Sequence, residues 1–478
     1  MSELNFKDLG LSTEILEAIE KLGYKKPSEV QEKVIPLILK NKDVMAKSQT
    51  GSGKTAAFAI PISEKLELEE RKIQVLVLAP TRELAYQIKE DFHNIGRFKR
   101  LRCAAIFGKQ PVSVQLNELK QRVHVVVGTP GRTFDLIERG ALDVSKIKYL
   151  VIDEADEMLN MGFIDQVKDI IKKLPKKKLT LLFSATMPEE ILELSSTYMK
   201  EPINIEIQAK SSVAERIKQT YYELENDKKF NLLDKLICVE KPDCAMIFCR
   251  TKENVEKLAS QMRAKGYSCN ALHGGMLQAD RTSMMNKFKR GEFTFLVATD
   301  IAARGIDVEN VTHVINYDIP MEKESYIHRM GRTGRAGSEG KAITFVTPRE
   351  YRFLQEIEEK FKLEIVKGEI PSEEEVKAGR ELYNKKVVKP KKNKTKEINK
   401  EITKIYISAG KKKKIRPGDI AGTISSIEGV NPEDVGIIDI QDNFSYVEVL
   451  GGKGNIVLEA LKNKTIKGKT IRAEKAQK

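Results

Sequence analysis

The sequence has no long hydrophobic run, few cysteines and no leader-like beginning. No apolar run approaches the roughly 20 residues that a helix needs to cross a bilayer, so a membrane protein is not expected. The first residues, MSELNFKDLGL, lack the basic start and apolar stretch of a signal peptide. The five cysteines form no CxxC pair, and their odd number argues against a disulfide framework. Together these absences predict a soluble cytoplasmic protein with ordinary buried thiols.

Positive charge is concentrated at one end of the chain. The formal net charge is +14, and residues 385–478 carry +11 of it, from 22 Lys or Arg against 11 Asp or Glu. A basic end on a nearly neutral body suggests that this end meets a polyanion. A solubilising tail would have the same composition, so charge alone leaves both interpretations open.

Two series of short apolar runs, each alternating with helical patterns, fill most of the chain. The first series is Val75–Leu78, Val123–Val127, Tyr149–Ile152 and Leu179–Phe183, and the second is Ala245–Phe248, Phe295–Ala298, His313–Ile315 and Ala342–Val346. Short runs rich in Val and Ile that alternate with helices are typical of buried strands in a parallel α/β sheet. We therefore predict two tandem α/β lobes, residues 1–208 and 213–370.

The chain beyond the second lobe divides into a polar stretch and a small domain. Residues 385–400 are almost all charged or polar and cannot bury enough apolar surface to fold alone. We place them in a basic flexible linker that covers residues 371–401. Strand-like segments return in residues 402–478, with a helical pattern at Asn455–Lys462, which predicts a small α+β domain that can fold by itself.

A phosphate-binding loop is the clearest motif of the first lobe. An apolar strand leads into Ser48, Gln49, Thr50, Gly51, Ser52, Gly53, Lys54 and Thr55, and a helical pattern follows. Ser48 stands where the usual pattern has Gly, and the rest fits. The glycines let backbone N–H groups curl around phosphates at a helix N-terminus. Lys54 would reach the β/γ-phosphates and Thr55 would bind Mg²⁺. A plain glycine-rich turn is the alternative, which the flanking strand and helix disfavour.

Carboxylates suited to the same metal follow another apolar strand. Asp153 and Glu154 come directly after Tyr149–Ile152. We expect Asp153 to hold Mg²⁺ through water and Glu154 to polarise the attacking water. Acidic residues are common at helix starts, because carboxylates favour that end of the helix dipole. Their combination with a phosphate loop favours the catalytic interpretation.

The four letters that begin at Asp153 spell DEAD, and the chain from Phe6 to about Thr347 resembles the DEAD-box RNA helicases in the order and spacing of a dozen short motifs. The resemblance implies two RecA-like lobes with ATP and Mg²⁺ as cofactors. The segment that ends at Gln31 resembles the family's Q motif. This implies that Gln31 bonds the adenine edge, a task that suits a side-chain amide, with Phe6 and Tyr24 as stacking partners.

The second lobe carries a segment, Tyr326–Arg335, that resembles the family's final motif. The resemblance implies that Arg332 and Arg335 reach the γ-phosphate of ATP held on the first lobe, with His328 in the same catalytic set. It also implies that Asp307 contacts the ribose. Arginine suits the task because its planar fork stays charged, and a surface salt bridge is the alternative for any single arginine. Hydrolysis would then require the lobes to close.

The resemblance also implies single-stranded RNA across both lobes, held by backbone amides and helix N-termini more than by base contacts. Ser184, Ala185 and Thr186 resemble the motif that couples nucleotide state to RNA binding. The implied RNA contacts are Pro80, Thr81, Arg82, Thr129, Gly131, Arg132, Arg250, Thr251, Gly274, Gly275, Gln278, Arg281 and Thr299. One departure is Gly108-Lys109, where many members have a Gly-Gly pair, so the sequence leaves the bend of that segment open.

The C-terminal segment, from Ile402 to Lys475, resembles the RNA-binding domain of the DbpA-type subgroup, a variant of the RRM. Phe444 and Tyr446 alternate and so point to one face of a sheet, where base stacking and core packing are equally consistent with the sequence. A basic turn is the preferred set of RNA contacts, with a solvated turn as its alternative: Lys411, Lys412, Lys413, Lys414 and Arg416.

The leading interpretation is an RNA-stimulated ATPase that unwinds short RNA duplexes. Members of the subgroup find a hairpin in large-subunit ribosomal RNA, so the resemblance implies 23S rRNA in a precursor of the 50S particle as the partner of an enzyme expected to be monomeric. An RNA-binding or annealing protein with an ATP-controlled grip is one alternative. A DNA helicase is disfavoured by the DEAD spelling and the RRM-like tail, and a transport or signalling ATPase by the arginine-bearing second lobe.

Overall fold

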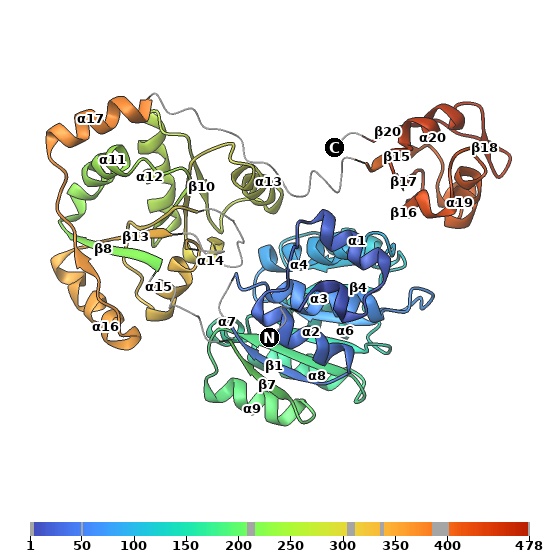
Figure 1. The fold of residues 1–478 in the computed structure, drawn as a ribbon, viewed down its shortest axis with the longest axis horizontal. Helices are drawn as coiled ribbons and strands as arrows, with labels where there is room; N and C mark the ends of the chain where they lie inside the picture. The colour runs from blue at the N-terminus through green and yellow to red at the C-terminus, as the bar shows by residue number, and fades with distance from the viewer. Residues whose placement is uncertain are drawn as a thin grey trace. The chain divides into compact units, whose positions relative to one another are not determined.

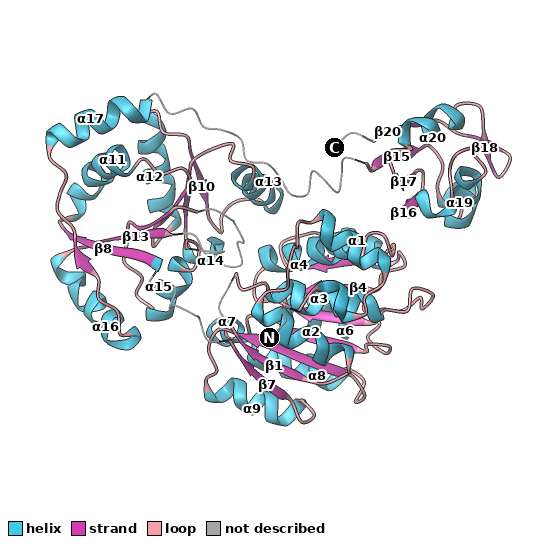
Figure 2. Cartoon of the chain, in the orientation of Figure 1, coloured by secondary structure: helices cyan, strands magenta, loops and turns pink. Residues whose placement is uncertain are grey.

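The computed structural model describes residues 4–48, 51–207, 216–303, 311–334, 339–384 and 401–476. These residues form two seven-stranded sheets whose paired strands are all parallel, and one four-stranded antiparallel sheet (Figures 1 and 2). The predicted fold class, two RecA-like α/β lobes followed by a small α+β domain, is confirmed. None of the helices in the described ranges is long and apolar enough to span a membrane.

The first lobe has the strand order β3-β4-β2-β5-β6-β1-β7. Its strands are β1 (Val44–Lys47), β2 (Val75–Leu78), β3 (Cys103–Ile106), β4 (Val125–Gly128), β5 (Tyr149–Ile152), β6 (Leu179–Ser184) and β7 (Ile203–Glu206). Its helices are η1 (Phe6–Leu9), α1 (Thr13–Lys21), α2 (Glu29–Leu39), α3 (Lys54–Lys65), α4 (Arg82–Ile95), α5 (Val112–Leu119), α6 (Pro130–Glu138), α7 (Ala155–Asn160), α8 (Ile164–Lys173) and α9 (Glu189–Tyr198).

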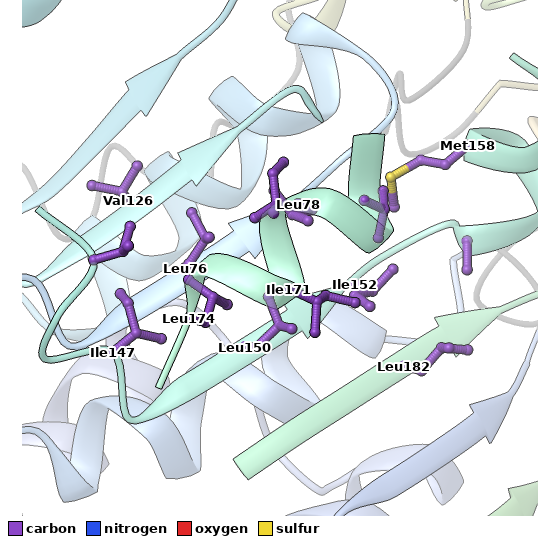
Figure 3. Packing of buried hydrophobic residues seen from close by; sticks show 14 of the residues in the cluster. Leu76, Leu78, Val126, Ile147, Leu150, Ile152, Met158, Ile171, Leu174 and Leu182 are labelled. Carbon is purple, nitrogen blue, oxygen red and sulfur yellow. The ribbon is translucent and has the colours of Figure 1, made fainter. Parts of the chain in front are cut away.

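Alternate residues of the first lobe's strands enter two different cores, because successive side chains of a strand point to opposite faces. On one face, Leu76, Leu78 and Leu150 pack against Met158 of α7 and Ile171 of α8 (Figure 3). On the other face, the ring of Phe58 on α3 contacts the rings of Phe183 and Phe92 at centroid distances of 5.3 and 6.0 Å. Helices on both faces explain why these strands are almost uniformly apolar.

The second lobe repeats the plan in the order β10-β11-β9-β12-β13-β8-β14. Its strands are β8 (Ile217–Glu223), β9 (Ala245–Phe248), β10 (Cys269–Leu272), β11 (Phe295–Ala298), β12 (His313–Asn316), β13 (Gly340–Val346) and β14 (Val366–Lys367). Its helices are η2 (Asn226–Lys228), α11 (Lys229–Glu240), α12 (Lys252–Ala264), α13 (Gln278–Lys289), α14 (Asp300–Ala303), α15 (Lys323–Met330), η4 (Pro348–Glu350), α16 (Tyr351–Phe361) and α17 (Glu373–Asn384).

Helix α17 corrects the expected boundary of the linker. The flexible linker was expected over residues 371–401, but residues 373–384 form α17, which packs on α11. Val376 is buried, Arg380 pairs with Asp234 of α11 at 2.7 Å, and the ring of Tyr383 meets that of Tyr267 at 5.6 Å. These contacts recur at helical spacing within a segment of which half the residues are charged, so composition concealed an amphipathic face. Residues 385–400 lie outside the described residues.

The C-terminal domain has the strand order β16-β17-β15-β20 and one helical face. Its elements are β15 (Thr403–Ile407), η5 (Lys411–Lys413), α19 (Pro417–Ser425), η6 (Pro432–Asp434), β16 (Val435–Ile440), β17 (Ser445–Val449), α20 (Gly454–Leu461), β18 (Thr465–Ile466), β19 (Lys469–Thr470) and β20 (Ala473–Lys475). Ile405 and Val447 of the sheet share a core with Ile420 of α19 and Leu461 of α20. The opposite face of the sheet does not belong to this core.

Candidate functional site

The carboxyl edge of the first sheet carries two groups of candidate residues. Parallel strands end along one edge, where the loops that follow them meet. The nucleotide motifs follow β1, β5 and β6, which are neighbours in the sheet, and the expected RNA contacts follow β2 and β4, which are also neighbours. Strand order therefore divides the edge into a nucleotide half and an RNA half, and β2 and β5 pair directly where the halves join.

The phosphate loop has the backbone that its glycines permit. Gly51 and Gly53 take φ values of 80° and 94°, in the left-handed region that suits glycine. Gly53 caps the N-terminus of α3, and the buried Lys54 donates from Nζ to the backbone oxygen of Ser48 at 3.2 Å. Lys54 thus lies folded back over the loop that an incoming phosphate would fill. Gln49 and Thr50 lie outside the described residues.

The amide of Gln31 lies against the phosphate loop. Its Nε2 donates to the backbone oxygen of Gly53 at 3.1 Å, and its Oε1 accepts from the backbone N–H of Ser28 at 3.0 Å. A Cβ on Gly53 would lie 2.5 Å from Gln31 Nε2, and the φ of 94° at this position would strain any residue with a side chain. The nearby aromatic pair is also assembled, since the rings of Phe6 and Tyr24 meet edge-on at 6.2 Å. Of the Q-motif residues, Gln31 and Ser28 therefore lie against the loop.

Asp153 and Glu154 lie buried at the end of β5. Burial raises the pKa of the Asp153 carboxyl to about 6, although the charge of Lys54 acts to lower it. Glu154 has a φ of 52° and caps α7, and its N–H donates to Asp153 Oδ1 at 3.0 Å. A non-glycine residue in this conformation is strained, which is a feature that often accompanies functional sites. A buried carboxyl beside the phosphate loop would be stabilised in its charged form by a cation.

Asp156 joins the nucleotide half of the edge to the loop after β6. Its Oδ2 accepts from the backbone N–H groups of Ala185 and Thr186 at 3.1 and 2.8 Å and from the Thr186 hydroxyl at 2.9 Å. Ser184 Oγ accepts in turn from the Asp156 N–H at 3.2 Å, and Ser184 O accepts from the N–H of Ser48 at 3.0 Å. No role was expected for Asp156 from the sequence. Its only signal there is its place as the last residue of the DEAD tetrapeptide.

The RNA half of the first lobe is built from helix starts. Thr81 caps α4, accepting from the Leu84 N–H at 3.2 Å, so it presents the segment of Pro80 and Arg82 at a helix N-terminus. Thr129 occupies the equivalent place before α6, whose first turn contains Gly131. Two of the expected RNA-contact segments therefore lie at the N-termini of helices that follow the adjacent strands β2 and β4. Helix N-termini suit the binding of phosphate groups.

The open question about Gly108-Lys109 has a clear answer. Lys109 takes a φ of 58°, so the segment bends there as a glycine would. Arg132 reaches the same loop, with Nη1 donating to Gln115 Oε1 at 3.0 Å and to the backbone oxygen of Gln110 at 3.3 Å. Gln115 in turn donates to the backbone oxygen of Phe107 at 2.8 Å. Lys109 adopts this left-handed conformation at the steric cost that a side chain carries there.

In the second lobe, the expected RNA contacts follow the adjacent strands β9, β11 and β10. Arg250 and Thr251 follow β9, Gly274 and Gly275 follow β10, and Thr299 follows β11. The guanidinium of Arg250 is paired with Glu350 of η4 at 2.6 Å. The backbone N–H of Arg250 donates to Asp318, a buried residue after β12, at 3.0 Å. Gln278 and the buried Arg281 lie in the first turn of α13, beside this group.

The arginines of the second-lobe motif differ in their contacts. Arg329 is buried and pairs with both oxygens of Asp300, at 2.5 and 2.7 Å, while its Nη1 donates to Asn316 Oδ1 at 3.0 Å. Arg329 therefore holds α15 to the sheet. Arg332 lies one turn further on, and its Nε donates to the backbone oxygen of His328 at 3.2 Å. Arg335 and Asp307 lie outside the described residues.

The face of the C-terminal sheet opposite its hydrophobic core carries an aromatic triad, the partly exposed rings of Tyr406, Phe444 and Tyr446. Their centroids lie 5.4 to 5.8 Å apart, and Lys404 Nζ lies 4.7 Å from the centre of the Tyr446 ring. The two aromatics found in the sequence thus lie outside the hydrophobic core, and Tyr406 is a third member that was missed. Its position directly opposite Tyr446 depends on strand register.

The basic turn lies beside this triad. The backbone N–H groups of Lys411 and Lys412 donate to the backbone oxygens of Gln441 and Asp442 at 2.9 Å each. Gly410 makes the approach possible, because a Cβ there would lie 2.2 Å from Gln441 O. The turn that leads to Phe444 is therefore hydrogen-bonded to the first two of the four exposed lysines.

These features define a class of protein: a phosphate-loop ATPase with two RecA-like lobes and a basic RNA-binding type of domain. Residues 28–194 match the family described as DEAD/DEAH box helicase, residues 228–337 the helicase conserved C-terminal domain, and residues 404–475 the DbpA RNA binding domain. The chain belongs to the DEAD-box ATP-dependent RNA helicases of the DbpA type, enzymes whose ATP hydrolysis is stimulated by RNA.

Individual relatives support this assignment. The chain is 54% identical over 477 residues to the ATP-dependent RNA helicase DbpA of Bacillus subtilis (strain 168), covering 99% of this chain and 100% of the relative. It is 47% identical over 376 residues to the DEAD-box ATP-dependent RNA helicase CshA of Geobacillus kaustophilus (strain HTA426), covering 79% and 80%. Among solved structures, S. cerevisiae Dbp5 bound to RNA and ADP BeF3 is 32% identical, with a TM-score of 0.69 and coverage of 80% and 100%.

Proposed function

We propose that this helicase unwinds short RNA duplexes during assembly of the large ribosomal subunit, anchored by its C-terminal domain to a hairpin of 23S rRNA. The observation that carries the proposal is the surface formed by the aromatic triad and the basic turn, in a domain that matches the DbpA RNA binding domain. Rings that stack on bases and lysines that meet phosphates suit the unpaired bases and bent backbone of a hairpin loop.

The first lobe holds the nucleotide in this proposal. The phosphate loop with Lys54 receives the phosphates, Gln31 exchanges its bond with Gly53 for the adenine edge, and Phe6 and Tyr24 border the base. Thr55 offers an oxygen ligand of the kind that Mg²⁺ prefers, and Asp153, whose pKa burial raises, would hold the ion through water. Bound Mg²⁺ would neutralise phosphate charge. Glu154 orients the attacking water, with its backbone fixed as the cap of α7.

The second lobe completes catalysis by closing on the first. Arg332 and Arg335 stabilise the charge that develops on the γ-phosphate. His328 belongs to the same motif and lies on α15. Asp307 contacts the ribose. The buried Arg329–Asp300 pair supports this by fixing α15 to the sheet. Hydrolysis then depends on closure, because no single lobe holds both the nucleotide and the arginines.

RNA links this chemistry to unwinding. The helix starts at Thr81, Thr129, Thr251 and Gln278 offer backbone amides to RNA phosphates, which gives a grip independent of sequence. Asp156, bonded to the Ser184 to Thr186 loop, ties the nucleotide half of the first sheet to that grip. The C-terminal domain supplies the specificity. The enzyme acts as a monomer in this scheme, in the cytoplasm where ribosomal RNA is assembled.

The proposal is tested with the full chain and two RNAs of equal length, a 23S rRNA fragment with the hairpin that DbpA-type members bind and an unrelated sequence. We expect a lower KM for the hairpin fragment in the RNA-stimulated ATPase assay. Phe444→Ala and Tyr406→Ala should lose this preference, by about 1–3 kcal/mol per stacked base, whereas Tyr406→Phe keeps the ring and should keep it. Equal KM values for both RNAs in the unmodified enzyme would refute the ribosomal anchor.

A strand-displacement assay tests the motor itself. A short duplex beside the hairpin should separate with ATP and more slowly with a non-hydrolysable analogue, because product release resets the closed lobes. Equal yields after many turnovers with the two nucleotides would instead indicate a protein whose ATP site only controls its grip on RNA.

A further inference from the structure

The imidazole of His273 connects a helix of the second lobe to a loop that is proposed to hold RNA. His273 comes directly after β10, and the chain from Gly274 to Leu277 leads on to α13. The ring is 9% exposed. Its Nδ1 accepts from the backbone N–H of Gly275 at 3.2 Å, and its Nε2 lies 2.6 Å from Glu256 Oε1 on α12. A role for this ring in RNA binding rests on the proposed function, which assigns RNA contacts to the loop.

These two hydrogen bonds determine where the ring carries its proton. A backbone N–H can only donate, so Nδ1 must be unprotonated to accept from Gly275. Nε2 then carries the single ring proton and donates it to the carboxylate of Glu256. The imidazole is therefore a neutral bridge with one end on the loop and the other on α12, the helix whose N-terminal cap is Thr251.

Of the two glycines in the loop, only Gly275 lies close to the ring. A Cβ on Gly275 would lie 3.1 Å from His273 Nδ1 and 3.2 Å from Cε1, which is tighter than ordinary contact, whereas a Cβ on Gly274 would meet nothing within 4 Å. Gly275 thus rests against the imidazole, although both glycines remain exposed to solvent. The ring supports the loop from beneath and leaves its outer side accessible.

We propose that His273 is a positioning residue for RNA binding, acting through Gly275. By holding the Gly275 N–H, the ring gives the loop one shape before RNA arrives, so binding does not have to order two glycines, the residues that lose most freedom when they are fixed. Glu256 contributes by fixing the tautomer and the ring orientation. His273 itself touches no RNA in this scheme.

Two isosteric substitutions separate the ends of the bridge. In His273→Asn the side-chain oxygen can take the place of Nδ1 and accept from Gly275, but the side chain is too short to reach Glu256. In His273→Gln the amide can take the place of Nε2 and reach Glu256, with only a methylene group near the Gly275 N–H. The assay is RNA-stimulated ATP hydrolysis by the full chain with an unstructured RNA oligonucleotide, and thermal melting verifies that each variant is folded.

We expect His273→Gln to raise the KM for RNA about 3- to 10-fold, roughly the value of one hydrogen bond, with the KM for ATP and the kcat at saturating RNA unchanged. His273→Asn should remain within about twofold of the unmodified enzyme, since it rescues the bond to the loop. Glu256→Ala should raise the KM for RNA in the unmodified background and have no further effect in His273→Asn, because the two residues would no longer be coupled.

Equal losses in the two isosteric variants, or a loss confined to kcat or to the KM for ATP, would overturn the positioning role and indicate a merely structural histidine. Arg250→Ala serves as a reference for the RNA site of this lobe. If Arg250→Ala raises the KM for RNA while His273→Gln does not, only the role of His273 fails. If Arg250→Ala also leaves the KM for RNA unchanged, the assignment of RNA to this edge of the second sheet fails with it.

Discussion

We predict that nucleotide binding depends on pH through the buried carboxyl of Asp153. Burial raises the pKa of this carboxyl from its ordinary 3.8 to about 6 in the nucleotide-free enzyme. If Asp153 holds Mg²⁺ when Mg·ADP binds, its proton must leave at any pH below about 6. The affinity for Mg·ADP should therefore fall up to about tenfold for each pH unit below 6, and this group should contribute no pH dependence above about 7.

Calorimetric titration in buffers of different ionisation enthalpy measures the protons released on binding. Because burial raises the pKa of Asp153 to about 6, this group should release most of a proton per Mg·ADP well below pH 6 and little above pH 7. Asp153→Asn should lack this component and retain only the protons of the nucleotide itself. Glu154→Gln is the matched control, because it keeps Asp153 and should keep the release. The same release from the unmodified enzyme and from Asp153→Asn would refute the reasoning.

The raised pKa of Asp153 also makes the free energy of unfolding depend on pH. The folded pKa of Asp153, about 6, lies above its unfolded value of 3.8, so the folded state binds this proton more tightly. The resulting contribution, about 3 kcal/mol at most, is present in full below pH 3.8 and is lost as the pH rises through 6. Without nucleotide, Asp153→Asn should remove this part of the pH dependence from the unfolding of the first lobe.

Buried or strained groups give three further predictions. Lys54→Ala, Glu154→Gln and Arg332→Ala should each abolish RNA-stimulated phosphate release, since an arginine finger alone contributes about 10³–10⁵ in rate; near-normal turnover in any of them would contradict its assignment. Arg329→Ala should destabilise the second lobe by about 3–5 kcal/mol, because it leaves a carboxylate without its partner, and denaturant unfolding would measure this. Lys109→Gly should stabilise the first lobe by about 1 kcal/mol by relieving a left-handed backbone, while an unchanged or lower melting temperature would count against strain at that bend.

Much of the site could be predicted because its motifs are local. A strand, a glycine-rich turn and a helix N-terminus are adjacent in the sequence, so the phosphate loop around Lys54 and the acidic pair at Asp153 can be recognised from composition and order. The departure at Lys109 could not be interpreted in the same way, because composition does not tell whether a lysine accepts a left-handed φ. The structure shows that it does.

Predictions from local sequence patterns failed where contacts between distant segments determine the structure. Half of the residues in the segment 373–384 are charged, which favours a linker, yet the segment forms α17 on α11. Its few contacts, such as those of Val376 and Tyr383, gain their value only from the partner helix. Tyr406 was missed for a similar reason, since it joins Phe444 and Tyr446 only when β15 pairs with β17 in one register.

The sequence by itself determined the class of fold and the family and predicted the nucleotide chemistry, because these depend on residue types at short, fixed spacings. The tertiary structure alone decided which strands are neighbours, and hence that nucleotide motifs occupy one half of the first sheet's edge and RNA motifs the other. It also decided that Arg329 is a buried anchor and that His273 bridges Gly275 to Glu256. The physical reason is that burial and hydrogen bonding join residues far apart in the chain, and no local spacing records such pairs.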